Sequence, residues 1–464
     1  MKKFDYSTYL SPFTWRYGSE QMREIWSETN KRKLWRKIWV ALATAQNKVG
    51  LVTKRELQDI TKHQEDIDIQ RAQEIEKEIY HDVMAEIKTF SEQCKIGGGK
   101  IHFGATSTDI TDNADIVQIK QALDLIKNKL ITLLKSFVIQ IEKHQNTVCM
   151  GYTHLQPAEP TTLGYRLCVY AQDLLWDLEF IKKIELFIKG KGIKGAVGTS
   201  ASYQKILNNK SYSTFELEKG IMKVLDLDPV EISGQTYPRK IDWFITTAIA
   251  NIAQSLHKFN FDLRIMQSPN FGEWSEPRSS KRVGSSAMPF KKNPDKAEKV
   301  CSLCRYVSSL LNVSWSNPAL SLLERTLDDS AGRRIFLPES FLAIDECIDT
   351  TNNLIKDLVV FEDVIEINLQ KYGIFSSTES LMMDLVKRGA NRQKIHEIIR
   401  ELSMQAWNQV LRGKTNPLVA LLSNDKRVLE YISKGSISTF FNPKDHIGLA
   451  KERTKKFLKK LKKR

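Results

Sequence analysis

The sequence predicts an all-α protein built around a bundle of long helices. Apolar residues recur every three or four positions along residues 119–141, 245–263 and 337–348, which is the spacing of one helix face. The first two runs exceed the usual helix length of about 11–12 residues. Alternating β-branched runs are scarce, and no strand–helix–strand rhythm occurs. These observations favour a helical bundle over a mixed α/β fold.

The length of 464 residues predicts more than one domain. We expect an N-terminal helical domain at residues 1–112, a central long-helix bundle at 113–364 and a C-terminal helical domain at 365–464. Helices this long and apolar usually need cover from other subunits, so the central bundle is expected to form the core of a homo-oligomer.

The composition, with 41% hydrophobic and 27% charged residues, is that of a soluble globular protein. The first residues lack the apolar core of a signal peptide, and no uncharged run reaches the ~18–20 residues of a membrane span. We therefore expect a cytoplasmic protein without a membrane partner.

Six scattered cysteines suit a reducing compartment and free thiols rather than a disulfide framework. Cys301 and Cys304 form a CxxC pair, but no second pair or histidine cluster follows it. We interpret both as buried thiols, in preference to a redox or zinc site.

The net charge of +15 raises the question of a nucleic-acid partner. The excess is uneven, because the tail at residues 451–464 carries nine Lys/Arg against one Glu. This tail fits an amphipathic helix end, with Phe457, Leu458 and Leu461 on one side, or a weak RNA-binding arm. We favour the solvated helix end, so nucleic acid is not an expected partner.

Residues 284–298 are the most informative stretch of the chain. Small residues, two hydroxyls, lysines, an asparagine and two prolines lie between two helical patterns. Such a segment is suited to fold over an anion, with N–H groups, hydroxyls and a cation converging. Its spacing, from Ser285 through Met288 and Lys291 to Asn293, resembles the signature loop of the fumarase/aspartase superfamily. An ordinary turn with capping serines is the weaker alternative.

Four other segments place polar residues at expected helix ends. His154 lies between Thr153 and Gln156 and is followed by two prolines, where a helix cannot run regularly. It is either a structural histidine or an acid/base group. In residues 101–112, hydroxyls after a glycine either cradle a carboxylate or cap a helix, with Asp109 or Thr111 as the cap.

The other two segments carry charged clusters. The adjacent His81 and Asp82 form either a salt-bridged cap or an oriented imidazole in a site, and we favour the site. Residues 324–334 contain three arginines with interposed acids. This pattern fits a surface charge network or the bidentate binding of carboxylate and phosphate groups.

Taken together, these segments resemble the adenylosuccinate lyase family. The resemblance rests on residues 233–240 and 324–334, on Arg16 and Tyr17, and on residues 377–397, and it runs from about residue 11 to 400. The segment at 153–158 resembles the superfamily's acid/base histidine motif. A cycloisomerase relative shares residues 104–107 and is the nearest competitor.

The resemblance implies β-elimination of fumarate from adenylosuccinate, which gives AMP, and from succinylaminoimidazole carboxamide ribotide. Ser285 would be the general base, and His154 the general acid that protonates the leaving nitrogen. The resemblance calls for no metal or cofactor. It also implies a homotetramer with active sites shared between subunits.

Further roles are carried over in the same way. Lys291 and Asn293 would stabilise the aci-carboxylate, and Thr106 and Ser107 would bind the succinyl carboxylates. The remaining expected substrate-binding residues are Arg16, Tyr17, Tyr80, His81, Asp82, Gln235, Lys299, Arg325, Ser330 and Arg334.

Two of these residues depart from the family pattern. Lys299 stands where some members carry a substrate-contacting arginine, and it lacks the planar fork of that side chain. Tyr80 stands where some members have a basic residue.

A basic helical scaffold or RNA-binding protein is the alternative of another class. It explains the charge of the tail but not the hydroxyl-rich loop at Ser285 or the turn at His154. A superfamily sibling acting on another succinyl or muconate substrate is the alternative among enzymes.

Overall fold

The computed structural model describes residues 5–208, 210–278 and 285–463. The chain divides into two compact units that each draw on three stretches of sequence. Unit 1 comprises Met1–Leu130, Trp176–Gln254 and Ser302–Asp349, and unit 2 comprises Ile131–Leu175, Ser255–Cys301 and Thr350–Arg464.

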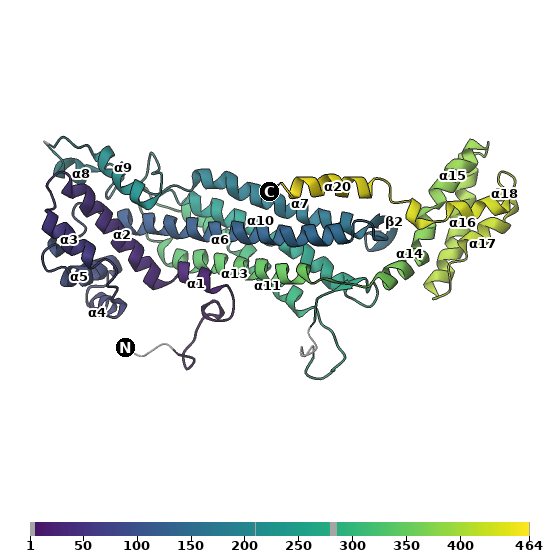
Figure 1. Cartoon of the computed structure of the whole chain (residues 1–464), viewed down its shortest axis with the longest axis horizontal. Coiled ribbons are helices and arrows are strands. Elements are labelled where there is room, and N and C mark those ends of the chain that lie inside the picture. Colours follow the sequence, from purple (N-terminus) through teal and green to yellow (C-terminus); the bar gives the residue numbers. More distant parts are fainter. Residues whose placement is uncertain (1–4, 209, 279–284, 464) are drawn as a thin grey trace. The chain divides into compact units, whose positions relative to one another are not determined.

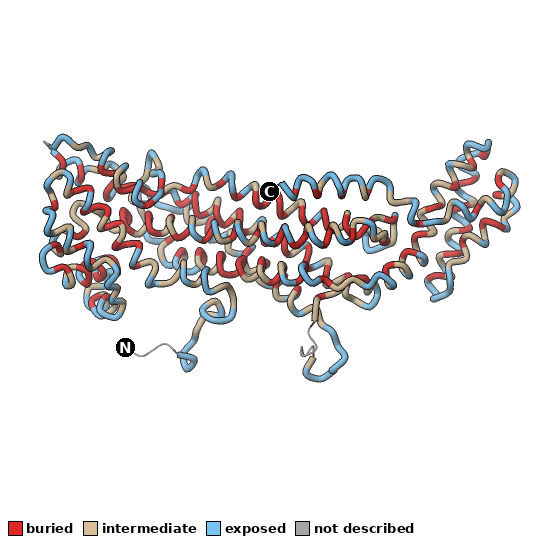
Figure 2. The backbone as a smooth tube through the Cα atoms, in the orientation of Figure 1, coloured by how far each residue is buried: buried red, intermediate tan, exposed pale blue. Residues whose placement is uncertain are grey.

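Five of the described helices, all labelled in Figure 1, contribute residues to both units. They are α6 (Ser107–Lys143), α7 (Leu163–Ile184), α10 (Lys240–Met266), α11 (Asp295–Ser309) and α13 (Ser330–Lys356). The apolar runs predicted at 119–141, 245–263 and 337–348 fall in α6, α10 and α13, and the residues that form those stripes are buried. Figure 2 shows buried residues along the length of these helices. The prediction of an all-α fold with long helices is confirmed.

Unit 1 adds shorter helices, several of which begin at capping side chains. Ser27 caps α2 by accepting a hydrogen bond from the Asn30 N–H, and Thr53 forms a capping box with Glu56 at the start of α3. The further elements are η1 (Pro12–Thr14), α1 (Glu20–Ile25), α2 (Glu28–Asn47), α3 (Lys54–Lys62), α4 (Ile69–Ile79), α5 (Asp82–Gln93), η2 (Gly98–Lys100), η3 (Glu185–Phe187), α8 (Ala201–Ile206), α9 (Thr214–Leu225) and α12 (Leu311–Ala319).

The described part of unit 2 contains two small antiparallel sheets. One pairs β1 (Val148–Thr153) with β2 (Gln156–Thr162), and the other pairs β3 (Trp274–Ser275) with β4 (Val359–Val360). The C-terminal helices share an apolar core that includes Leu381, Ile395 and Leu418. The further elements are α14 (Glu362–Ser376), α15 (Thr378–Lys387), α16 (Arg392–Leu411), α17 (Leu418–Asn424), α18 (Lys426–Leu429), α19 (Lys434–Ile437), η4 (Ser438–Phe440), η5 (Pro443–Asp445) and α20 (Ala450–Leu461).

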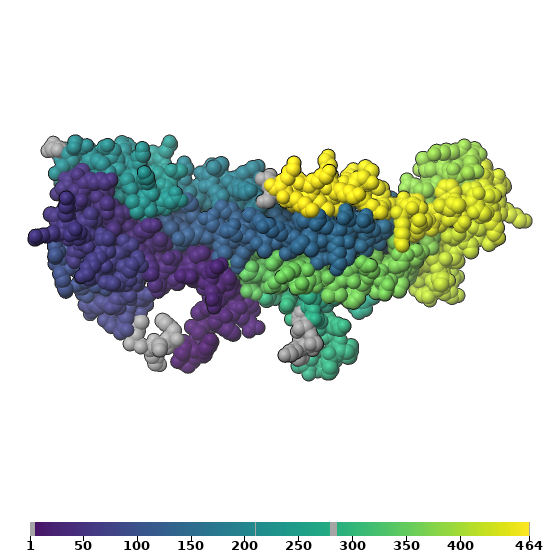
Figure 3. Space-filling view, in the orientation of Figure 1, coloured from purple at the N-terminus to yellow at the C-terminus, as the bar shows by residue number. Residues whose placement is uncertain are grey.

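Most of the basic tail lies in α20, which packs beside β2 of the same unit. In Figure 3 this helix is the yellow segment at the surface. Leu458 and Leu461 are buried, while Lys455, Lys456 and Lys459 are exposed. The predicted amphipathic helix end is therefore present.

All six cysteines are buried free thiols, as interpreted from the sequence. Within the described ranges, no helix combines the length and apolar character needed to cross a membrane.

Candidate active site

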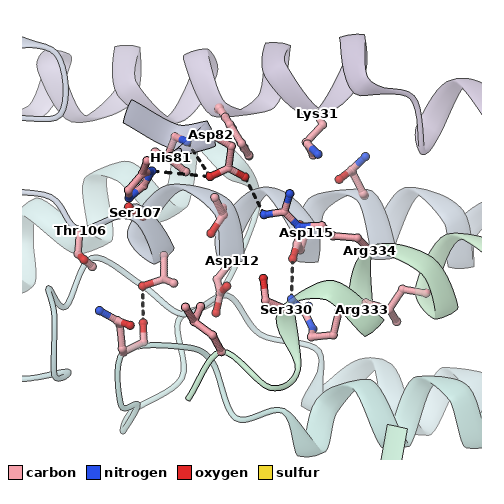
Figure 4. Close-up of a pocket in the computed structure, with 18 of the residues that line it drawn as sticks. Lys31, His81, Asp82, Thr106, Ser107, Asp112, Asp115, Ser330, Arg333 and Arg334 are labelled. Carbon is pink, nitrogen blue, oxygen red and sulfur yellow. Dashed lines mark hydrogen bonds and ion pairs between the residues drawn. The ribbon is translucent and has the colours of Figure 1, made fainter. Parts of the chain in front are cut away.

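A pocket of about 570 Å³ in unit 1 collects nine of the residues predicted from the sequence (Figure 4). They arrive from four separate stretches of the chain, at the junction of α4 and α5, the start of α6, the segment before α10, and the segment that leads into α13. The nine residues are Tyr80, His81, Asp82, Thr106, Ser107, Gln235, Arg325, Ser330 and Arg334.

His81 and Asp82 begin helix α5 at one side of the pocket. His81 is the N-cap, and its Nδ1 accepts a hydrogen bond from the Met84 N–H over 3.3 Å. This bond assigns the proton of the neutral ring to Nε2. Tyr80, just before it, adopts a left-handed conformation and is almost fully exposed.

Asp82 pairs with Arg334 of α13 at 2.7 Å, which joins two elements 252 residues apart in sequence. Burial alone would raise the pKa of Asp82, but the charge and hydrogen bond of Arg334, the Val83 N–H and the charge of Lys31 together hold this pKa below its usual value. The pair therefore caps helix α5 and also lines the pocket, and its role in orienting an imidazole in a site stays a prediction.

Thr106 and Ser107 line the pocket where helix α6 begins. Of the two interpretations of this segment, the one with Asp109 or Thr111 as the cap is wrong, because the helix already starts at Ser107. Asp109 instead lies inside the first turn, and its Oδ2 accepts a hydrogen bond from the Thr106 N–H over 3.0 Å.

Gln235 reaches the pocket through a tightly packed segment. Its N–H donates to the carbonyl of Glu324 over 3.0 Å, and its carbonyl accepts from Thr108 Oγ1 at 2.5 Å. A Cβ on Gly234 would lie 2.7 Å from the Glu324 carbonyl oxygen, so only glycine permits this approach.

Two buried arginines, Arg239 and Arg333, form a charge network with acidic residues of the pocket. They were not among the site residues predicted from the sequence. Arg239 holds Asp112 with two hydrogen bonds of 3.0 and 3.2 Å, and Arg333 contacts Asp115 at 3.1 Å. Burial raises the pKa of Asp115, although Arg333 opposes this shift. Arg325, which was predicted, pairs with Asp329 at 2.7 Å.

The network had a partial signal in the sequence. Asp112 and Asp115 are three positions apart on one helix, which places them on the same face. Lys31 of α2 also lines the pocket and was missed, because nothing near it in sequence marks it as different from a surface lysine.

Arg16 and Tyr17 belong to unit 1 but are not among the residues that line this pocket. The Arg16 guanidinium lies 5.7 Å from the Trp15 ring and 5.8 Å from the Tyr17 ring. Their role in binding stays a prediction.

Five predicted residues belong to unit 2. His154 lies not at a helix end, as expected, but in the turn between β1 and β2. Thr153 and Gln156 are paired, so His154 and Leu155 form a two-residue turn, and both have positive φ, at 53° and 58°. The side chain of His154 is exposed.

Ser285 opens the described part of the predicted loop at 284–298, and Gly284 lies outside the described residues. The Ser285 Oγ accepts hydrogen bonds from the N–H groups of Ala287 at 3.3 Å and Met288 at 3.0 Å. Lys291 is exposed, whereas Asn293 and Lys299 are partly buried.

The second half of this loop is anchored within unit 2. Gln267 donates to the Lys292 carbonyl over 2.8 Å, and Arg278 donates to the Asn293 carbonyl over 2.6 Å. The start of α11 is held in turn by Glu276, which accepts the Ala297 N–H over 2.7 Å.

Comparison with known proteins adds a second line of observation. The lyase family model matches residues 15–308, and the model for the adenylosuccinate lyase C-terminus matches residues 375–457. The chain is 37% identical to an adenylosuccinate lyase of Schistosoma mansoni, over 98% of this chain and 95% of the relative. An adenylosuccinate lyase of Saccharomyces cerevisiae shows the same identity and coverage. This chain belongs to the adenylosuccinate lyase family.

The family extends to archaea, with 34% identity to an adenylosuccinate lyase of Pyrococcus horikoshii over 97% of both chains. Solved structures confirm the fumarase/aspartase-like fold. A 3-carboxy-cis,cis-muconate lactonizing enzyme from Pseudomonas putida covers 97% of this chain and 99% of its own with a TM-score of 0.86 at 22% identity. A fumarate lyase from Mesorhizobium has the same identity and coverage and a TM-score of 0.83.

Proposed function

We propose that this chain is a lyase that eliminates fumarate from adenylosuccinate, releasing AMP, and from succinylaminoimidazole carboxamide ribotide. The observation that carries the proposal is the near full-length similarity to adenylosuccinate lyases from eukaryotes and archaea. Both reactions would belong to purine nucleotide synthesis.

The chemistry of the unit 1 pocket supports an anionic nucleotide substrate. Arg325 and Arg334 offer guanidinium groups for carboxylate or phosphate, and Ser330 adds a hydroxyl group. His81 offers Nε2–H as a further donor. Thr106 and Ser107 would bind the succinyl carboxylates, and Gln235 would lie beside the reacting nitrogen.

Ser285 is proposed as the general base that removes the proton next to a succinyl carboxylate. A serine hydroxyl is normally a very weak acid, so its alkoxide needs stabilisation. The N–H groups of Ala287 and Met288 already point at Oγ, and such donors favour the negative form. Lys291 and Asn293 of the same loop would stabilise the aci-carboxylate that forms.

His154 is proposed as the general acid that protonates the leaving nitrogen. Its turn supports an unusual role, because two consecutive non-glycine residues with positive φ are costly and tend to occur at functional sites. We further propose a cytoplasmic homotetramer in which different subunits contribute residues to one active site. Exposed large apolar side chains such as Trp176, Phe187 and Trp315 in unit 1 support such an assembly.

The test mixes the purified protein with adenylosuccinate and follows the ultraviolet absorbance. Cleavage to AMP and fumarate is expected for the wild type, with a fall of about 10²–10⁴-fold in kcat for Ser285→Ala. Ser286→Ala, a neighbouring hydroxyl without an assigned role, is the matched control and should keep most of the activity. No turnover by the folded wild type would overturn the proposed reaction, and full turnover by Ser285→Ala would overturn the choice of base.

A further inference from the structure

A buried lysine–aspartate pair lies directly behind the wall of the pocket. Lys191 Nζ is 2.5 Å from Asp109 Oδ1, and both side chains are completely buried. Neither residue lines the pocket, but Thr106, Ser107 and Thr108, which precede Asp109 along the chain, all do. The pair is therefore separated from the pocket by one turn of backbone.

The side chain of Asp109 contacts several hydrogen-bond donors at once. Besides the Lys191 ammonium group, it accepts hydrogen bonds at 3.0–3.2 Å from three backbone N–H groups and one phenol, namely those of Thr106, Lys194, Gly195 and Tyr203. These contacts reach both oxygens of the Asp109 carboxylate.

Lys191 is fixed in place by the loop that carries it. The Asn113 side chain makes two hydrogen bonds to the backbone of Gly192, at 3.0 and 3.1 Å. Lys191 Nζ also donates to the Gly195 carbonyl over 2.9 Å. A Cβ at Gly192 would meet Glu218 Oε1 at 2.2 Å, so the loop depends on glycine at this position. The lysine is thus placed by several independent contacts.

The Lys191–Asp109 pair affects the electrostatic potential at the start of α6. A carboxylate in the first turn of α6 suits the positive end of the helix dipole, but its charge would repel an anionic ligand bound at the same turn. Buried charges are weakly screened, so the repulsion would act through the backbone. The ammonium group of Lys191 cancels the charge of Asp109 and leaves the turn's own N–H groups and hydroxyls to attract an anion.

We propose that Lys191 is a positioning residue that neutralises Asp109 and so allows the turn at Thr106 and Ser107 to bind the succinyl carboxylates. This inference rests on the proposed function, which places fumarate at this turn. It predicts a selective effect, since the charge should act on fumarate and much less on AMP, whose groups bind elsewhere in the pocket.

The test measures inhibition of adenylosuccinate cleavage by fumarate and by AMP, and compares the ratio of the two inhibition constants. Lys191→Met should weaken fumarate binding by about tenfold or more and leave AMP binding within about twofold. Lys191→Met combined with Asp109→Asn removes both charges and should restore most of the fumarate affinity. Asp109→Asn alone should move the ratio in the opposite direction, towards tighter fumarate binding.

Lys194→Met is the matched control. Lys194 comes from the same loop and forms a similar 2.5 Å pair with Glu218, which does not line the pocket. Lys194→Met should lower the stability of the protein without changing the ratio of the fumarate and AMP inhibition constants. Equal loss of fumarate and AMP affinity in Lys191→Met, or no recovery in the double variant, would overturn the inference. If Lys191→Met fails to fold, Asp109→Asn provides the test. An unchanged ratio of the fumarate and AMP inhibition constants in Asp109→Asn would also overturn the inference. Absence of cleavage by the wild type would instead reject the proposed function.

Discussion

His102 precedes the turn that lines the pocket and lies against the core of unit 1. Its Nδ1 accepts a hydrogen bond from Trp39 Nε1 over 3.0 Å. Burial lowers the pKa of His102 to about 4 from an ordinary value near 6.5, despite the opposing charge of Asp109. The ring is therefore neutral in the folded protein throughout the physiological range.

This shift predicts a pH-dependent stability. Between pH 6.5 and 4 the unfolded chain binds a proton at His102 that the folded protein does not, so stability falls as the pH decreases through this window. The loss should reach up to about 3 kcal/mol at pH 4. His102→Asn keeps an acceptor and tolerates the positive φ of 67° at this position, and it should flatten the dependence. Denaturant unfolding at several pH values checks this prediction. A free energy of unfolding that falls equally steeply with decreasing pH in His102→Asn would contradict it.

The Asp82–Arg334 pair makes a second prediction for a single residue. Because the pKa of Asp82 is lowered in the folded protein, the pair stabilises the protein at neutral pH, and this contribution disappears as acid protonates the carboxylate. Asp82→Asn should cost little stability, since Arg334 is more than half exposed. Its effect should fall mainly on substrate binding, which a rise in KM with nearly constant kcat would reveal. A loss confined to kcat would contradict this role.

At the scale of one element, the β1–β2 hairpin contains measurable backbone strain. Leu155 is exposed and adopts a positive φ of 58°, a conformation that costs a branched or bulky residue about 1–2 kcal/mol. Leu155→Gly should therefore raise stability by about 0.5–1 kcal/mol, after allowing for the entropy of glycine. Leu155→Val, which is β-branched, should lower it. Thermal unfolding of the two variants decides the point, and a lower melting temperature for Leu155→Gly would refute the argument.

Helix α20 offers a contrast between its two faces. Leu458 is buried against unit 2, whereas Lys459 beside it is exposed. Leu458→Asp would bury an unpaired charge and should cost about 2 kcal/mol or more, while Lys459→Ser should stay within about 0.5 kcal/mol of the wild type. Chemical denaturation measures both. A large effect of Lys459→Ser on stability would show that the basic face has a structural partner.

Substitutions in the basic tail can distinguish its two interpretations. A solvated helix end predicts that replacing Lys455, Lys459 and Lys463 by glutamine leaves both turnover and stability unchanged. Salt-dependent RNA binding that disappears in this variant would support the alternative of an RNA-binding arm.

At the scale of the whole molecule, the proposed assembly makes its own prediction. Sedimentation should give a particle of four times the 53.4 kDa chain mass. If subunits share active sites, then mixing two impaired variants, Ser285→Ala from unit 2 and His81→Ala from unit 1, should restore part of the lost activity after reassembly. Each variant reassembled alone is the control. A monomer with full activity would exclude the shared site.

Several features of this molecule followed from the sequence alone. The stripes in α6, α10 and α13 were readable because helical periodicity is a local property that burial of one face imposes. The loop at Ser285 and the segment around Arg325 were recognisable because chemistry at a site requires particular residue types at fixed spacing. The resemblance to the family that the sequence indicated rested on those same spacings.

Other features were decided only by the tertiary structure. His154 was expected at a helix end, but pairing of Thr153 with Gln156 across a hairpin placed it in a turn. Lys31 resembles a surface cation in sequence and lines the pocket only because distant helices meet there. The hydrogen-bond partners of the Asp109 carboxylate lie 82 or more residues away, apart from Thr106. Electrostatic interactions depend on distance in space, which spacing along the chain does not specify for residues on different elements.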